Sequence, residues 1–267
     1  MKRFFWVMIT CISLAACSNY KNIEDVKQTD FSKVATAKGV TLYRNGEDFI
    51  QIVKISEGAS LHLILGPQTQ SGEVIYFGRG NIREWFHKWS SKNPQGFSAI
   101  NAEFFDETNP SIAQLAFSVK ENSTVYKGYG DKSEYPAKKM LLIFDANHYD
   151  TEQYNDLSKD LQNRQQNNGI VGLRIDAPKS PDRAVGRTYI GIRKGNEVVI
   201  FSSPSSTREY ATKALQIFGV ENDNMMMLDG GPSAQLVFGN TLLVSSNPKP
   251  VRIPAIIVIE AGHDSPR

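Results

Sequence analysis

Residues 225–236, MMMLDGGPSAQL, are the part of this 267-residue chain whose residue types and spacing best fit chemistry. The apolar run 225–228 predicts a buried strand that stops at Asp229. Gly230, Gly231 and Pro232 follow, a combination that forces a sharp change of direction. A strand end of this kind would hold the Asp229 carboxylate rigidly while its head faces a cleft. The alternative is an ordinary hairpin turn, because Asp-Gly is also a common hairpin signal.

Two further islands place polar side chains after apolar runs. The first is Asn101–Asp106, and the second is Arg187-Thr188. Arg187, with Arg183 four residues before it, gives the second island a cation. The structural alternative for Arg187 is a strand-end charge paired with a carboxylate.

Together and in this order, the three islands resemble the phosphodiester glycosidase family, whose members carry an uncovering-enzyme-like domain. The matching segments are AINAEFFD at 99–106, RTYIG at 187–191 and LDGGPS at 228–233, within a resemblance that spans roughly Gly39 to Glu260. Two positions depart from the family pattern: Ala102-Glu103 stand where Gly-Gly is more usual, and Pro232 stands where a third glycine is usual.

The resemblance implies an envelope hydrolase that cleaves the glycosidic C–O bond of a sugar-1-phosphodiester in a glycoconjugate. A phosphate monoester leaves more easily than an alkoxide, so such a site needs a cation for the phosphate and a carboxylate for the anomeric carbon more than it needs a strong acid. The expected catalytic residues are Asp229, Arg187 and Asn101. A guanidinium fork suits a phosphate group better than an ammonium does, so Arg187 is the expected phosphate ligand, with Arg183 as the second choice. The expected substrate-binding residues are Gly230, Gly231, Ser233, Glu103, Asp106 and Thr188.

Two other functions remain open from the sequence. The protein could bind sugar phosphates without turning them over, since Ala102-Glu103 and Pro232 depart from the family pattern. It could instead be a metal-dependent phosphodiesterase that breaks the P–O bond, with Asp106, Glu103 and Asp229 as ligands. No recognised metal spacing is present, so we expect no metal site and no cofactor.

The elements that must position these residues are mostly strands. Periodicity and turn signals predict strands at 40–43, 49–55, 61–65, 97–105, 115–119, 140–144, 169–175, 188–193, 198–202, 225–228, 235–238, 242–245 and 255–259. Helices are expected at 83–89 and at 207–218, the second capped by Thr207 and ended by Gly219. Residues 147–168 read as a polar helix or loop. The fold class is therefore α+β: a strand-rich single domain with a twisted mixed sheet and a few packed helices.

The N-terminus has the layout of a lipoprotein signal. A basic start and an apolar run at 4–14 lead into Leu14-Ala15-Ala16-Cys17, which resembles a lipobox with lipid attachment at Cys17. A plain signal peptide cut near Ala16 is the alternative. We expect a signal peptide at 1–16, a tether at 17–37 and a folded domain at 38–262, held at the bacterial cell envelope by its lipid.

Composition agrees with such a location and gives no sign of a nucleic-acid partner or a polybasic membrane patch. The chain has two cysteines, Cys11 and Cys17, so a lipidated mature protein could form no internal disulfide. The net charge is +2, and Lys2 and Arg3 would leave with the signal. A near-neutral protein gives no sign of a nucleic-acid partner. In a host with an outer membrane, Ser18 after the cysteine favours the periplasmic side of that membrane. The oligomeric state is left open.

Overall fold

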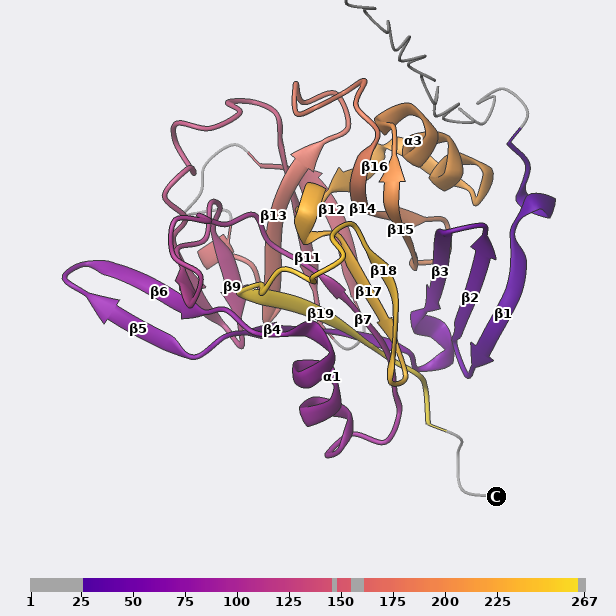
Figure 1. Cartoon of the computed structure of the whole chain (residues 1–267), viewed down its shortest axis with the longest axis horizontal. Helices are drawn as coiled ribbons and strands as arrows, with labels where there is room; N and C mark the ends of the chain where they lie inside the picture. Colours follow the sequence, from indigo (N-terminus) through magenta and orange to yellow (C-terminus); the bar gives the residue numbers. More distant parts are fainter. Residues whose placement is uncertain (1–25, 146–147, 155–160, 264–267) are drawn as a thin grey trace, which may run out of the picture.

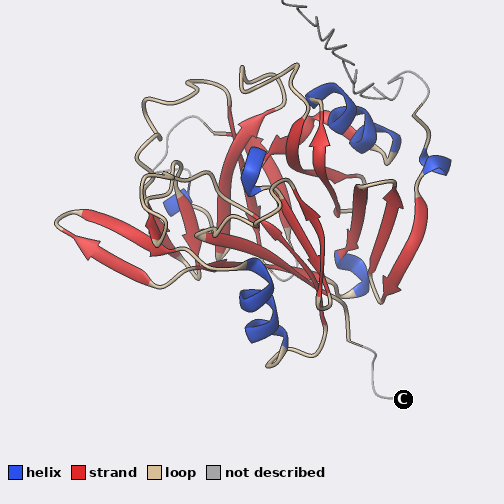
Figure 2. Cartoon of the chain, viewed as in Figure 1, coloured by secondary structure: helices blue, strands red, loops and turns tan. Residues whose placement is uncertain are grey.

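Two β-sheets packed face to face, with a helix against each outer side, make up most of the computed structural model (Figure 1 and Figure 2). The structure describes residues 26–145, 148–154 and 161–263. All strand pairs in these ranges are antiparallel. The fold is mixed α and β but largely β, as the sequence predicted.

The larger sheet runs in the order β1-β2-β3-β15-β14-β16-β13-β11-β12, with β9 pairing with β13 and β10 with β9. Its strands are β1 (Ser32–Ala37), β2 (Val40–Asn45), β3 (Asp48–Lys54), β9 (Val119–Glu121), β10 (Thr124–Tyr126), β11 (Lys139–Phe144), β12 (Tyr149–Gln153), β13 (Asn168–Arg174), β14 (Val185–Arg193), β15 (Glu197–Ser206) and β16 (Val220–Met227). The alternating apolar residues of these strands bury both faces of the sheet.

The smaller sheet runs in the order β18-β17-β7-β19-β4. Its strands are β4 (Ser60–Leu65), β7 (Gly96–Asn101), β17 (Gln235–Phe238), β18 (Thr241–Ser245) and β19 (Ala255–Glu260). A third sheet is formed by β5 (Gln68–Ser71), β6 (Val74–Gly78) and β8 (Ile112–Ala113). The β5–β6 hairpin projects from the body of the molecule (Figure 1).

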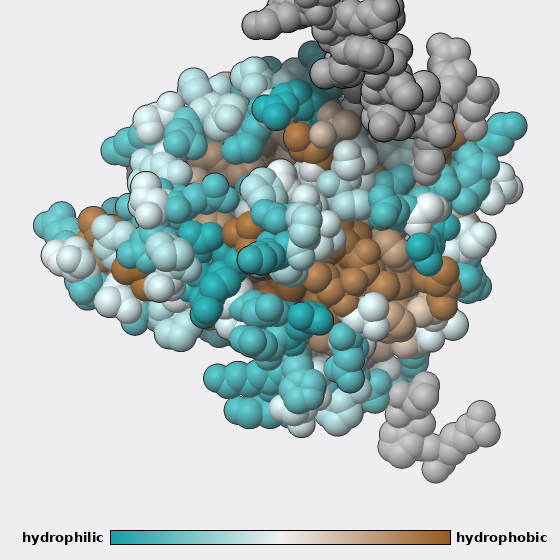
Figure 3. Space-filling model, viewed as in Figure 1, coloured by the Kyte–Doolittle hydropathy of each residue, from teal (hydrophilic) through white to brown (hydrophobic). Residues whose placement is uncertain are grey.

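Three apolar clusters separate these layers. The largest lies between the two sheets, with Leu42, Ile190 and Met226 from the larger sheet and Ile100 and Ile257 from the smaller. A second joins the other face of the larger sheet to α3 (Arg208–Ile217). A third joins the outer face of the smaller sheet to α1 (Ile82–Ser90). The face seen in Figure 3 is largely hydrophilic, with an apolar area where Figure 1 places β17 and β18.

The helix signals in the sequence are confirmed. The Thr207 hydroxyl accepts a hydrogen bond from the Tyr210 amide at the start of α3, and Gly219 follows the helix with φ +89°. In α1, Phe86 is buried while Trp85 and Trp89 are half-buried against the smaller sheet. The aromatic face of this helix therefore serves packing.

Several boundaries differ from the prediction. The sheets are antiparallel rather than mixed. The strand expected at 97–105 ends at Asn101, because that side chain turns into hydrogen bonds between the sheets. Of the strand expected at 115–119, only a bridge at Leu115 and the start of β9 exist.

Two segments taken for tether or loop belong to the larger sheet. Residues 32–37 of the expected tether form β1, and Phe31 before it is buried. Within the polar segment 147–168, residues 149–153 form β12, because the Tyr149 ring is buried and its hydroxyl accepts from the Leu61 amide. The signal peptide and Cys17 lie outside the described residues.

Candidate functional site

Asp229 lies where the chain crosses from the larger sheet to the smaller one. The strand β16 before it belongs to the larger sheet, and β17 after it belongs to the smaller sheet. The hairpin alternative is therefore wrong, since these two strands do not pair with each other. The crossing is tied to both sheets: the Leu228 amide donates to Thr188 O at 2.9 Å, and the Asp229 amide donates to Ala102 O at 3.1 Å.

Asn101, at the end of β7, fastens this crossing. Its Nδ2 atom donates to Asp229 O at 2.6 Å, and its Oδ1 atom accepts from the Thr188 hydroxyl at 2.6 Å and from the Gln235 amide at 3.0 Å. One buried amide thus joins the Asp229 backbone to β14 of the larger sheet and β17 of the smaller. The sequence predicted that Asn101 would contact substrate, but its side chain is 1% exposed and is used to position Asp229.

The glycines let the crossing lie close against β14. A Cβ atom on Gly186 would stand 2.2 Å from Gly231 O, and a Cβ on Gly230 would stand 2.7 Å from Gly186 O. Both distances are too short for real side chains, so each position requires glycine. Gly231 has φ +57° and begins a short 3₁₀ turn, Gly231–Ser233, that turns the chain toward β17.

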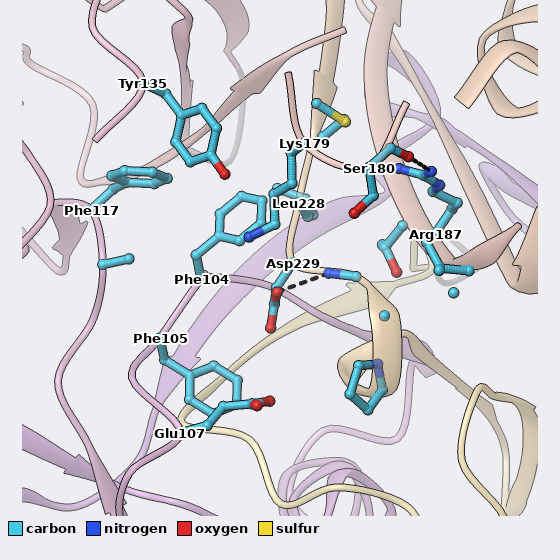
Figure 4. Close-up of a pocket in the computed structure, with 18 of the residues that line it drawn as sticks. Phe104, Phe105, Glu107, Phe117, Tyr135, Lys179, Ser180, Arg187, Leu228 and Asp229 are labelled. Atoms are coloured by element: carbon cyan, nitrogen blue, oxygen red, sulfur yellow. Dashed lines mark hydrogen bonds between the residues drawn. The ribbon is translucent and has the colours of Figure 1, made fainter. Parts of the chain in front are cut away.

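The Asp229 carboxylate is partly exposed and strongly desolvated. Burial raises its pKa to about 6, against contributions from Ser233, Lys179 and the Gly230 amide that lower it. The Gly230 amide donates to Oδ1 at 2.9 Å (Figure 4). A carboxyl group with a pKa near 6 is mostly ionised at neutral pH but exchanges protons easily, which suits acid–base chemistry.

A cavity of about 540 Å³ opens over Asp229, a size typical of small-molecule sites. Its lining combines two kinds of side chain. Phe104, Phe105, Phe117, Tyr129 and Tyr135 form its aromatic side, and the cations Lys179, Arg183 and Arg187 also line it. Figure 4 shows Asp229 between the rings of Phe117 and Tyr135 and the side chain of Arg187, with Lys179 next to Phe104. Acidic residues Asp106, Glu107 and Glu134 also line the cavity.

Arg187 is used mainly to hold the segment around Ser180 and Arg183 together. Its Nη2 atom donates to Ser180 O at 2.5 Å and to Arg183 O at 2.9 Å, and its Nε atom donates to Ser206 O at 3.2 Å. The side chain is 4% exposed, and burial lowers its pKa. The residue lines the cavity as expected, but two of its three nitrogen atoms are bound to main-chain carbonyls. The paired carboxylate of the structural alternative is not among these partners.

Lys179 presents a cation that Arg187 does not. Its ammonium lies over the Phe104 ring, 4.6 Å from the centroid, and 5.9 Å from that of Tyr135 (Figure 4). Cation–π contacts of this kind orient an ammonium without neutralising its charge. The charge reaches Asp229, whose pKa it lowers. The Lys179 side chain therefore places its ammonium near the Asp229 carboxylate.

The other predicted site residues fall into two groups. Gly230, Gly231, Thr188 and Asp106 line the cavity, together with Asp229 and Arg187. The Asp106 carboxylate accepts from the amide and the hydroxyl of Thr108, so it shapes its own turn. The buried residues Asn101, Glu103 and Ser233 do not line the cavity.

Glu103 is the clearest correction among these residues. Its side chain is 2% exposed, and one oxygen accepts from the Phe104 amide at 3.1 Å. The other oxygen is buried without a hydrogen-bond partner. Burial raises the pKa of Glu103 well above its ordinary value, and nearby Asp131 and Asp229 raise it further. These contacts place Glu103 in the core beside the site and not among the residues that line the cavity.

Sequence reasoning missed Lys179, Glu107 and the aromatic side of the cavity. Lys179 stands in the polar segment Ala177-Pro178-Lys179-Ser180-Pro181, where no strand or helix pattern marks it. Proline on each side of a short basic segment, a few residues before Arg183 and Arg187, was the available signal. Among the described residues, no three His, Cys, Asp or Glu side chains gather where they could hold a metal ion. No helix in those same ranges has the length and apolarity to span a bilayer.

Comparisons with known proteins agree with this fold. The structure is similar to the catalytic domain of zebrafish N-acetylglucosamine-1-phosphodiester α-N-acetylglucosaminidase, auto-inhibited by its pro-peptide, with a TM-score of 0.56, 16% identity and coverage of 86% of this chain and 81% of that one. A hypothetical protein from Synechocystis gives a TM-score of 0.49 at 13% identity, covering 86% and 61%. No family model and no curated protein matches the sequence. The likeness is one of fold alone: this chain's fold resembles that of the zebrafish catalytic domain.

Proposed function

We propose that this protein is a hydrolase that cleaves the C–O bond between a sugar and a phosphodiester. The observation that carries the proposal is Asp229, a desolvated carboxylate with a pKa of about 6 in one cavity lined by both aromatic and cationic side chains. A sugar-1-phosphodiester has a ring on one side of the scissile bond and a charged phosphate on the other. The aromatic and the cationic residues of the lining match these two parts.

In the proposed reaction, the ionised Asp229 acts on the anomeric carbon, either by attacking it or by taking a proton from an attacking water. The bond from that carbon to the phosphate oxygen breaks, and the phosphate monoester leaves with the bonding electron pair. Water supplies the new sugar hydroxyl. The leaving group is stable as an anion. A cation of the cavity lining that binds this phosphate therefore stabilises the transition state more than a strong acid would.

Lys179 takes the role of phosphate ligand that the sequence assigned to Arg187. Its ammonium faces the cavity near Asp229, whereas Nε and Nη2 of Arg187 hold the carbonyls of Ser180, Arg183 and Ser206. Arg187 then acts as a positioning residue for the segment that carries Lys179. Arg183 is exposed at the edge of the cavity and can meet the outer part of the phosphodiester.

The kinetic test uses a panel of hexose 1-phosphodiesters with one common aglycone, followed by chromatography. The wild type should hydrolyse at least one, and kcat/KM should rise with pH through about 6, where Asp229 ionises. Asp229→Asn should abolish turnover. Near-normal turnover by Asp229→Asn would reject the mechanism. Binding of the panel without hydrolysis by the wild type would instead indicate a sugar-phosphate receptor.

We also propose that the protein is anchored to the envelope through Cys17. The support is the sequence Leu14-Ala15-Ala16-Cys17 behind a basic start and an apolar run. A lipid-modified cysteine with two or three acyl chains gives stable membrane attachment, whereas one chain does not. Metabolic labelling with radioactive palmitate should mark the wild type and not Cys17→Ser. Equal labelling of both proteins would contradict the anchor.

A further inference from the structure

Tyr129 is an aromatic side chain left open at the cavity. It is 44% exposed, and it and Val34 are the large hydrophobic side chains that stay exposed among the described residues. Unlike Val34, it lines the cavity over Asp229. A tyrosine in a ligand cavity offers a flat apolar face and a polar hydroxyl at its tip.

The backbone around Tyr129 is held rigidly, although the side chain itself is not packed. The Tyr129 amide donates to Leu115 O at 3.1 Å, and the Gly130 amide donates to Ala116 O at 2.7 Å. A Cβ atom on Gly128 would stand 2.3 Å from Phe117 Cα, so the chain lies directly on the neighbouring segment at this point. A mobile surface loop would need none of these contacts.

A buried carboxylate completes the support. Asp131 is 8% exposed, and it accepts hydrogen bonds from the amide and hydroxyl of Ser118 and from the amide of Gly128. Burial raises its pKa, which shows that desolvating this group opposes folding. The fold therefore uses a costly buried acid to fix a segment whose tyrosine stays open to the cavity. Fixing the backbone that carries the exposed ring lowers the entropy lost when a ligand stacks on that ring.

The groups around the ring indicate which ligand it suits. Burial, with smaller contributions from the carboxylates of Glu134, Asp106 and Asp229, raises the pKa of Tyr129 to about 12, so its hydroxyl stays protonated and can donate. Neighbouring carboxylates accept hydrogen bonds from sugar hydroxyls and repel acidic groups. The Lys179 ammonium, over the Phe104 ring of the same cavity, is the cation that a phosphate on this sugar would meet (Figure 4).

We infer that Tyr129 is the stacking platform for the sugar ring of the substrate, and that the ring it takes is a hexopyranose without a carboxylate. The inference rests on the proposed function and deepens it, because it fixes the direction of the substrate. The sugar lies on Tyr129 and the aromatic side, the anomeric carbon lies over Asp229, and the phosphate faces Lys179. Tyr129 contacts substrate but takes no part in the bond-breaking step.

The test separates sugar binding from phosphate binding and from turnover. Tyr129→Ala should lower kcat/KM for hexose 1-phosphodiesters about tenfold, mostly through KM, while Tyr129→Phe keeps the ring and stays within about twofold. Saturation-transfer NMR should detect methyl α-hexosides on the wild type but not on Tyr129→Ala. Inhibition by methyl phosphate should be equal in both, because that probe binds Lys179 and not Tyr129. Tyr76→Ala, on the β5–β6 hairpin outside the cavity, is the matched control.

Two results would overturn the inference. One is an unchanged KM and an unchanged hexoside NMR signal in a folded Tyr129→Ala protein. The other is an equal loss of methyl phosphate and hexoside binding, which would mean that the ring supports the whole cavity. Failure of the proposed function can be told apart from failure of this inference. A wild-type protein that hydrolyses no hexose 1-phosphodiester but still gives a hexoside NMR signal, lost in Tyr129→Ala, would reject the hydrolase and keep the platform. Weaker binding of a hexuronoside than of the hexoside supports the neutral-sugar assignment, and equal or tighter binding contradicts it.

Discussion

At the scale of single residues, the site depends on a carboxylate kept in an unfavourable environment. Asp229 has a folded-state pKa of about 6 against an ordinary value of 3.8, and burial is the main cause. The ionised form is therefore less stable in the folded protein than in the unfolded chain. A group whose pKa is raised on folding favours the folded state at low pH and opposes it as pH rises through the folded value.

This sign gives a direct prediction for stability. Asp229→Asn should increase the free energy of unfolding at pH 8 by about 1–3 kcal/mol, because it removes a desolvated charge while its amide oxygen can still accept from Gly230. The gain should vanish near pH 4, where the wild-type carboxyl is protonated. Urea unfolding at the two pH values measures it. A variant less stable than the wild type at pH 8 would mean that the carboxylate is satisfied rather than strained.

The two cations of the site should respond differently to substitution. Lys179→Ala should lower kcat/KM about 10–100-fold, or roughly 1.4–2.7 kcal/mol, abolish inhibition by inorganic phosphate and leave the melting temperature nearly unchanged. Arg187→Lys should instead lower the free energy of unfolding by about 2–4 kcal/mol, because a lysine cannot reach three carbonyls with a planar fork.

Steady-state inhibition and thermal melting distinguish the two roles. If phosphate still inhibits Lys179→Ala but no longer inhibits a folded Arg187→Lys protein, then Arg187 binds phosphate as the sequence first suggested. The sequence favoured Arg187 because arginine has the better geometry for phosphate. It could not show that main-chain carbonyls 4, 7 and 19 residues away occupy two of its nitrogen atoms.

At the scale of elements, the site is a junction between sheets rather than the end of one strand. Asn101 connects β7 to the Asp229 backbone, to β14 through Thr188 and to β17 through Gln235. The islands that the sequence singled out do meet here, which is why their order along the chain was informative. Their individual roles depend on where each side chain points. The alternation of apolar and polar residues along a strand does not specify this for the residues at the strand's end.

The hydrogen bonds of Asn101 at this junction should contribute measurably to the free energy of unfolding. Asn101→Ala removes three hydrogen bonds in a buried place and should lower the free energy of unfolding by about 2–4 kcal/mol. Thr188→Val keeps the volume and removes one of those bonds, so its cost should be about 1 kcal/mol. Equilibrium denaturation of both variants provides the comparison. A cost for Asn101→Ala no larger than that of Thr188→Val would contradict the proposed fastening role.

At the scale of the whole molecule, the sequence predicted the class of fold well and the limits of the domain less well. Strands in the core were recognised by unbroken apolar runs such as 140–144 and 255–259. The edge strands β1 and β12 were missed. Edge strands tolerate polar residues and are not buried on both faces, so their sequences lack an unbroken apolar run. Antiparallel pairing was also beyond the reach of periodicity, since it depends on which strands are neighbours.

The N-terminal limit of the domain can be tested with a matched pair. Phe31 is buried and its ring makes an edge contact with Phe218 at 5.5 Å, whereas Val34 in β1 is 50% exposed. Phe31→Ala should cost about 3–4 kcal/mol and Val34→Ala less than about 0.5 kcal/mol in unfolding free energy. Similar small effects for both would return residues 26–37 to the tether, as the sequence analysis had them.

The central claim is that the sugar–oxygen bond is the one that breaks, under the action of Asp229. Hydrolysis of a hexose 1-phosphodiester in ¹⁸O-labelled water, followed by mass spectrometry of both products, tests it most directly. The account predicts label in the anomeric hydroxyl of the released sugar, none in the phosphate monoester, and no turnover by Asp229→Asn. Label in the phosphate product would show P–O cleavage and contradict the account.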